Sequence, residues 1–171
     1  RFLASQSIML ALRGVPGIYF HSLFGSRNWR EGIKHTSRYR TINRQKLSLT
    51  ALEDELANPN SLQAQVFNGF RRLLGFRRVN PAFHPWGGQR VLSIDKTIFT
   101  VLRTDPDSRY QTLCLTNVTS NIVTIEMDAE QLPEFASQPI QDLLDGEQFE
   151  FSDGNWRIEI GPYQVRWLQK L

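Results

Sequence analysis

The stretch that decides the fold is Leu12-Arg13-Gly14-Val15-Pro16-Gly17-Ile18-Tyr19-Phe20. Residues 1–11 before it are apolar and helix-prone, and Gly14 with Pro16 predicts the end of that helix. Residues 17–20 are β-branched or aromatic without polar alternation, which is typical of a short buried strand. Helix, tight turn and buried strand together predict a parallel α/β unit. Because the helix is apolar on nearly every side, we expect the chain to be a piece of a larger fold, with Phe2, Ile8 and Leu12 poorly covered.

Composition places the 171 residues among ordinary globular chains, with 40% hydrophobic residues. The apolar run at residues 2–24 is interrupted too often to reach the roughly 20 consecutive apolar residues of a membrane span, and it lacks the pattern of a signal peptide. We therefore expect no membrane association. The single cysteine, Cys114, excludes an internal disulfide and favours a cytoplasmic location, and we expect its thiol to be buried and inert.

Charge divides the chain into two parts. Residues 1–90 hold 14 Lys/Arg against 4 Asp/Glu, and residues 91–171 hold 6 against 13. This division predicts two units with different surfaces. The basic residues are scattered and follow no nucleic-acid-binding motif, so a substrate phosphate or an acidic neighbouring domain is a better partner for them than nucleic acid.

Helices are predicted through the first half. Residues 21–46 form a long polar segment without a sustained period, and such segments are often functional. Thr50 and Glu53 form a capping-box pattern for a helix ending near residue 57. Asn58 and Pro59 are the expected cap and first turn of a second helix. Its apolar stripe, which leaves Arg71, Arg72 and Arg78 on the solvent side, comprises Leu62, Val66, Phe70 and Leu73/Leu74.

Strands are predicted from residue 86 onward. Runs rich in β-branched and aromatic residues occupy 89–94, 98–103, 110–116, 122–127, 156–160 and 163–168. Asp145-Gly146 and Asp153-Gly154 are hairpin signals. An antiparallel sandwich of about seven strands fits this spacing. The acids Asp142, Asp145, Glu147 and Glu150 fall at one of these hairpins, where we expect a solvated turn rather than a catalytic pair.

Five segments of the sequence carry a resemblance to a known family. Residues 8–20 resemble the seventh helix and eighth strand of the α-amylase superfamily barrel. Residues 40–44, read as Arg-Thr-Ile-Asn-Arg, resemble a segment of the sucrose phosphorylase subfamily, and the loop at 21–28 is similar to its glucosylglycerate phosphorylase branch. Residues 142–146 and 161–168 resemble the closing strands of the β-domain in amylase-type enzymes.

The resemblance implies a fold of class α/β plus all-β. Residues 1–85 would be the end of a (β/α)8 barrel with its last strand, catalytic-face loop and last helices. Residues 86–171 would be a C-terminal antiparallel β-sandwich domain. The family transfers glucose with retention through two carboxylates that lie about 5–5.5 Å apart, with phosphate as the acceptor, and the product is α-glucose 1-phosphate. The implied partners are a sugar, inorganic phosphate and an N-terminal barrel segment of the same protein; we expect no cofactor and no metal.

The family's catalytic carboxylates correspond to positions before Arg1, so we expect this chain alone to be inactive. The resemblance transfers one substrate-binding residue, Arg40, which matches the arginine that binds the 4-hydroxyl of the transferred glucosyl unit. The chain has Tyr39 where sucrose phosphorylases usually have glycine, so Arg38 is the alternative. His21 would follow the last strand at the catalytic face of the barrel and could line the pocket.

Two alternatives remain open. The parent protein could be an α-glucosidase or amylase-type hydrolase rather than a phosphorylase. The chain could also be a non-catalytic carbohydrate- or protein-binding module in which Trp86, Trp156 or Trp167 stacks on a ligand. The alternating strands around Trp156 and Trp167 favour core packing for these two side chains instead.

Overall fold

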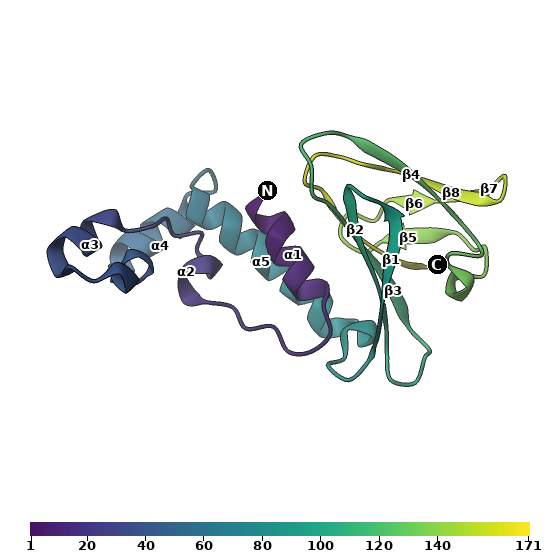
Figure 1. Cartoon of the computed structure of the whole chain (residues 1–171), viewed down its shortest axis with the longest axis horizontal. Coiled ribbons are helices and arrows are strands. Elements are labelled where there is room, and N and C mark those ends of the chain that lie inside the picture. Colours follow the sequence, from purple (N-terminus) through teal and green to yellow (C-terminus); the bar gives the residue numbers. More distant parts are fainter. The chain divides into compact units, whose positions relative to one another are not determined.

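The computed structural model describes all residues 1–171 and contains two compact units (Figure 1). One unit combines Arg1–Pro16 with Leu73–Leu171, and the other is Gly17–Arg72. The chain therefore passes from one unit to the other between residues 16 and 17 and again between residues 72 and 73. The sequence predicted the domain boundary after residue 85. The first helix belongs to the same compact unit as the β-sheets.

Helix α1 (Phe2–Ala11) forms as predicted. Its buried side consists of Ala4, Ser7, Leu10 and Ala11, while Phe2 and Leu12 are 41% and 38% exposed. Gly14 has a φ of +105°, a conformation that glycine adopts easily and that turns the chain after the helix. The expected exposure is thus observed for Phe2 and Leu12, whereas Ile8 is half-buried.

The strand expected at residues 17–20 does not form. Residues 17–19 have no regular structure, and the short helix α2 (Phe20–Leu23) begins at Phe20. A parallel strand fills its hydrogen bonds only through a neighbouring strand, and no strand of this chain pairs with residues 17–20. The strand prediction is therefore wrong for this structure.

The Gly17–Arg72 unit is helical. It contains α2, α3 (Arg30–Thr36), the 3-10 helix η1 (Tyr39–Asn43), α4 (Leu49–Ala57) and the first part of α5 (Leu62–Val79). Both predicted caps are displaced. Ser48 caps α4 by accepting from the Ala51 amide, and Ser61 accepts from the Ala64 amide at the start of α5 at 3.0 Å. The predicted stripe of α5 is buried at Val66, Phe70 and Leu73, whereas Leu62 is 43% exposed.

The strands form two antiparallel sheets, as predicted. The larger sheet has the order β1-β2-β3-β9-β5-β6, and the smaller has the order β4-β8-β7. The short 3-10 helices η2 (Pro81–Phe83) and η3 (Pro133–Phe135) precede β1 and β5. The strand bounds are β1 Gly88–Asp95, β2 Ile98–Thr104, β3 Gln111–Asn117, β4 Val123–Asp128, β5 Ile140–Asp142, β6 Gln148–Phe149, β7 Phe151–Ser152, β8 Asn155–Ile160 and β9 Val165–Lys170.

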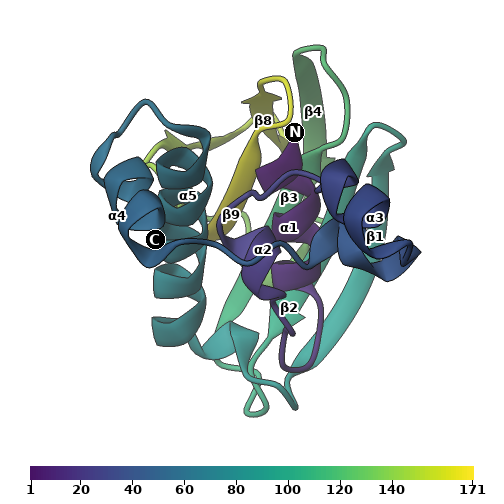
Figure 2. The same ribbon diagram turned by 90° about the vertical axis from the view of Figure 1, so that its left-hand side faces the viewer.

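The large sheet is covered on both faces. On one face, Leu113 of β3 and Leu168 of β9 are paired in register and contribute to the core shared with the small sheet. On the other face, Cys114 pairs with Trp167, and α1 packs over β2 and β3 (Figure 2). A hydrogen bond of 3.1 Å between the hydroxyls of Ser7 and Thr116 joins α1 to β3. No helix of the chain combines the length and the apolar character that crossing a membrane would require.

Candidate functional site

The polar segment after residue 17 is folded rather than irregular. The Tyr19 hydroxyl donates to the Asn43 carbonyl at 2.8 Å, and the Trp29 amide donates to the Ile42 carbonyl at 2.6 Å. These two bonds hold the end of η1 against residues far from it in sequence. The segment predicted to carry function therefore has a defined shape.

Trp29 also fixes the start of α3. Its indole lies directly over Gly32, where an added Cβ would come within 2.2 Å of the ring. Only glycine permits this contact, because any larger side chain would push the indole away. α3 ends at Ser37, which has a left-handed φ of 52°, and the chain then turns into η1.

His21 lies inside this framework and is half-buried. Its Nδ1 is 3.2 Å from the Ser26 hydroxyl, and the rings of Tyr19 and Phe20 lie 5.5 Å from its own ring. Two aromatic neighbours and one hydrogen bond determine the position of the imidazole. His21 forms no hydrogen bond or ring contact with Arg38 or Arg40; Tyr19, whose ring lies beside His21, donates to the end of η1.

Arg38 and Arg40 lie on either side of Tyr39, at the start of η1. Both arginines are exposed, and neither guanidinium forms a hydrogen bond or an ion pair with the chain. Tyr39 between them is 85% exposed. Five donors on each guanidinium are thus available to a ligand that carries hydroxyl or anionic oxygens.

The helical unit has no paired carboxylates suited to glycosyl transfer. Glu31 stands alone on α3, and the other acids of this unit, Glu53, Asp54 and Glu55, are exposed on α4. Asp54 and Glu55 line a hollow of about 280 Å³. Consecutive residues of a helix point in different directions, so these two carboxylates do not face each other across a bond. No group of three or more His, Cys, Asp or Glu residues is arranged to hold a metal ion.

Asp142 is not part of a solvated turn, which corrects the expectation from sequence. It is fully buried, with Oδ1 accepting from the amides of Leu144 and Trp167 at 2.9 and 3.0 Å. Its Oδ2 lies 3.2 Å from the guanidinium of Arg166, which also pairs with Asp145 at 3.3 Å. Burial raises the pKa of Asp142, against the lowering produced by the two amides.

The same arginine reaches Glu147 at 2.7 Å and lies 5.0 Å from the centre of the Phe149 ring. One guanidinium therefore organises three carboxylates of the hairpin around β5 and β6. This arrangement occupies the carboxylates and makes them structural. The expected solvated turn holds for Asp145, Glu147 and Glu150, which are exposed, and is wrong for Asp142, which is buried.

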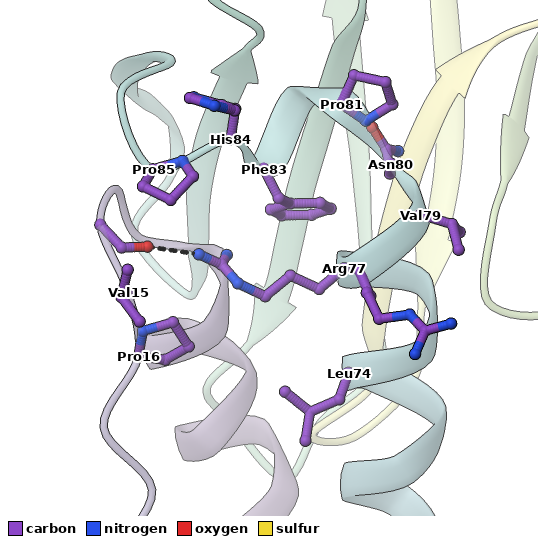
Figure 3. A pocket seen from close by; sticks show the side chains of 12 residues that line it. Val15, Pro16, Leu74, Arg77, Val79, Asn80, Pro81, Phe83, His84 and Pro85 are labelled. Atoms are coloured by element: carbon purple, nitrogen blue, oxygen red, sulfur yellow. Dashed lines mark hydrogen bonds between the residues drawn. The ribbon is translucent and has the colours of Figure 1, made fainter.

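A cavity of about 590 Å³ lies in the unit that contains the sheets (Figure 3). Arg77 extends across it beneath Phe83 and donates to the Gly14 carbonyl at 2.7 Å and to the Leu10 carbonyl. Arg103 of β2 donates to the Ala11 carbonyl at 3.1 Å. Two buried arginines thus satisfy the carbonyls at the end of α1, and burial lowers the pKa of both. The cavity lining contains no acid, so we assign it no catalytic role.

Sequence reasoning missed the role of Arg77, although the signal was present. Arg77 lies seven positions after Phe70 and four after Leu73, on the buried stripe of α5. By contrast, Cys114 is buried as expected, and burial raises the pKa of its thiol. Trp156 and Trp167 are both fully buried, as the strand alternation predicted, and Trp86 is 80% exposed.

Comparisons with known proteins agree with the family resemblance. No protein-family model matches the chain. Glucosylglycerate phosphorylase from Spirochaeta thermophila is 43% identical over 98% of this chain, and that from Allomeiothermus silvanus is 33% identical, also over 98%. The enzyme of the same name from Escherichia coli is 29% identical over 99%. This chain is homologous to part of the glucosylglycerate phosphorylases. It spans less than a third of their length, covering 29%, 26% and 28% of the three relatives.

Solved structures show the same fold in α-amylase-type enzymes. AmyP in complex with maltose has a TM-score of 0.76 at 18% identity, over 98% of this chain and 34% of that protein. The α-amylase from Geobacillus thermoleovorans has a TM-score of 0.74 at 12% identity, over 98% of this chain and 32% of that enzyme. The predicted antiparallel β-sandwich is thus confirmed, and the chain matches about a third of each of these enzymes, although the barrel strand expected at residues 17–20 does not form.

Proposed function

We propose that this chain supplies a substrate-binding loop and the closing β-domain of a retaining α-glucosyl phosphorylase. The observation that carries the proposal is the similarity of nearly the whole chain to three glucosylglycerate phosphorylases, at 29–43% identity. The reaction would be phosphorolysis of glucosylglycerate to α-glucose 1-phosphate and glycerate. Sucrose is the second candidate donor, because residues 40–44 resemble the sucrose phosphorylase segment.

In this proposal the reacting carboxylates belong to parts of the parent protein outside residues 1–171. One carboxylate attacks the anomeric carbon, and a second carboxylic acid protonates the departing oxygen of glycerate. Phosphate then attacks the glucosyl–enzyme ester, releases the carboxylate and keeps the original anomeric configuration. The chain alone would be inactive, because its helical unit offers no facing pair of acids.

The role proposed for Arg40 is to bind the transferred glucosyl unit through a hydroxyl group. Its guanidinium is exposed, has no partner in the chain and lies on a 3-10 helix anchored by Tyr19 and Trp29. Arg38 is the alternative, because it shares the exposure and lacks a partner. His21 would shape the wall of the same pocket, since its hydrogen bond to Ser26 fixes the ring.

The test uses the full-length parent protein that contains this chain. Purified enzyme is incubated with glucosylglycerate or sucrose, each with and without inorganic phosphate, and α-glucose 1-phosphate and free glucose are measured. We expect α-glucose 1-phosphate only when phosphate is present, with glucosylglycerate as the better donor. Release of free glucose alone, at a rate independent of phosphate, would instead identify a hydrolase.

A further inference from the structure

One segment accounts for the positive charge of the chain. Residues 27–46 contain seven Lys/Arg residues and a single acid, Glu31. The rest of the chain contains 13 Lys/Arg and 16 Asp/Glu residues, so it is slightly acidic. We call residues 27–46 the cationic segment; its seven basic side chains are Arg27, Arg30, Lys34, Arg38, Arg40, Arg44 and Lys46.

None of these charges is neutralised by a neighbour. All seven side chains are exposed, and none of the five ion pairs of the chain involves them. The acids that do form ion pairs all lie between residues 107 and 147, in the other compact unit. An excess of six positive charges over 20 residues is therefore not compensated by any ion pair within residues 1–171.

The backbone keeps these charges together. Within the segment, α3 and η1 pack on each other, and the hydroxyls of Thr36 and Thr41 lie 2.8 Å apart. The amide of Trp29 donates to the Ile42 carbonyl, which closes the segment on itself. Because the segment is folded, its seven basic residues are carried on one compact piece of backbone instead of an extended loop.

We propose that the cationic segment raises the local concentration of anionic substrates at Arg40. The inference rests on the proposed function, in which phosphate, the glycerate carboxylate and glucose 1-phosphate are all anions. Clustered charge of one sign increases the encounter rate and local concentration of opposite charges by about 10- to 1,000-fold in favourable cases. The range of this attraction is set by the Debye length, which is about 30 Å in 0.01 M salt and about 3 Å in 1 M salt. The attraction should therefore be strong at low salt and screened at high salt.

The cationic segment contains two groups of basic residues with different roles. Arg38 and Arg40 are candidates for direct contact with substrate, whereas Arg27, Arg30 and Lys34 act through their charge alone. Removing charge from the second group should therefore weaken the attraction without removing a ligand of the sugar. This difference makes the proposal testable independently of substrate contacts.

The experiment compares R27Q/R30Q/K34Q with K96Q/R157Q/K170Q in the full-length parent. Both triple variants lose three positive charges, but the second loses them from strands and turns of the β-sheet unit. kcat/KM for phosphorolysis of glucosylglycerate is measured between about 10 mM and about 0.5 M salt. We expect a decrease of about 3- to 10-fold for R27Q/R30Q/K34Q at the lowest salt, vanishing at the highest. The matched variant should stay within about 1.5-fold of the unmodified enzyme throughout.

An uncharged donor completes the test. Hydrolysis of α-glucosyl fluoride involves the glucosyl subsite but no anionic donor or acceptor, so R27Q/R30Q/K34Q should leave its kcat/KM unchanged. Equal losses with both donors would overturn the inference and indicate damage to the loop. An unchanged kcat/KM for phosphorolysis by R27Q/R30Q/K34Q at low salt would also overturn it. This holds even if the segment binds a polyanion such as heparin, because such binding would not show an effect on the substrate. Failure of the unmodified enzyme to form glucose 1-phosphate would instead refute the proposed function.

Discussion

Replacing Arg77 by methionine tests the packing that joins α1 to the β-sheet unit. The guanidinium donates to the carbonyls of Leu10 and Gly14 and lies 5.3 Å from the centre of the Phe83 ring. R77M keeps the length of the apolar stem and removes both hydrogen bonds. The carbonyl of Leu10 then remains in a buried position without this donor.

The expected loss is the balance of two opposing effects. A hydrogen bond to a charged group contributes about 1.5–3 kcal/mol, so two bonds correspond to about 3–6 kcal/mol. Removing a charge that burial disfavours, next to the positive Arg103, recovers a part of this. We expect R77M to lower the free energy of unfolding by about 2–3 kcal/mol.

Urea unfolding of the 171-residue chain, followed by tryptophan fluorescence, measures this difference at constant m-value. The neighbouring Arg78 is exposed and provides a matched control, and R78M should stay within about 0.5 kcal/mol of the unmodified chain. Equal stability of R77M and R78M would refute the assignment of Arg77 as the cap of α1.

Three further predictions concern single sites. D142N should destabilise the chain by about 3 kcal/mol because it leaves a buried arginine partly unpaired, whereas D145N, at a partly exposed partner, should cost less than about 1 kcal/mol; thermal unfolding compares the two, and equal losses would contradict this account. Backbone amides, chiefly that of Tyr110, lower the pKa of Asp105, so its stabilisation is complete above the unfolded value of 3.8 and is lost as the pH falls below it. D105N should accordingly reduce the stability difference between neutral and acid pH, and an unchanged difference in acid titrations would argue against it. G32A should displace the Trp29 indole and speed amide hydrogen exchange in the loop. G75A, with open space at its Cβ, should instead stabilise α5 by about 0.5–1 kcal/mol. Unchanged amide exchange in G32A would disprove the contact between Gly32 and the indole.

The sequence predicted the β-sheets well because their signals are local. Alternating β-branched and aromatic runs separated by Asp-Gly and Asp-Pro turns determine where β2, β3, β4 and β8 begin and end. The same alternation correctly predicted that Trp156 and Trp167 are buried. Such patterns need no knowledge of distant residues.

Predictions failed where the outcome depends on a partner elsewhere in the chain or absent from it. Residues 17–20 have the composition of a strand, but strand formation requires a paired neighbour. Asp142 lies at a hairpin signal, yet Arg166, 24 residues later, draws it into the core. The helix caps were misplaced by two and three residues because Ser48 and Ser61 compete with equally suitable residues nearby.

The candidate site was only partly predictable. The motif at residues 40–44 identified Arg40, and the structure adds that this side chain is exposed and without a partner. The bond from Tyr19 to Asn43, which anchors η1, spans 24 residues and leaves no periodic signal in the sequence. The assignments of Arg38, Arg40 and His21 to substrate remain predictions.

The most direct test of the central claim is phosphorolysis of glucosylglycerate by the full-length parent carrying R40M, with R72M as the control for loss of an exposed arginine. We predict that R40M lowers kcat/KM by about 10- to 150-fold, which corresponds to one charge-assisted hydrogen bond to the glucosyl unit, and that R72M changes it less than about 2-fold. An R40M enzyme with the kcat/KM of the unmodified protein would contradict the claim that this loop binds the transferred sugar through Arg40.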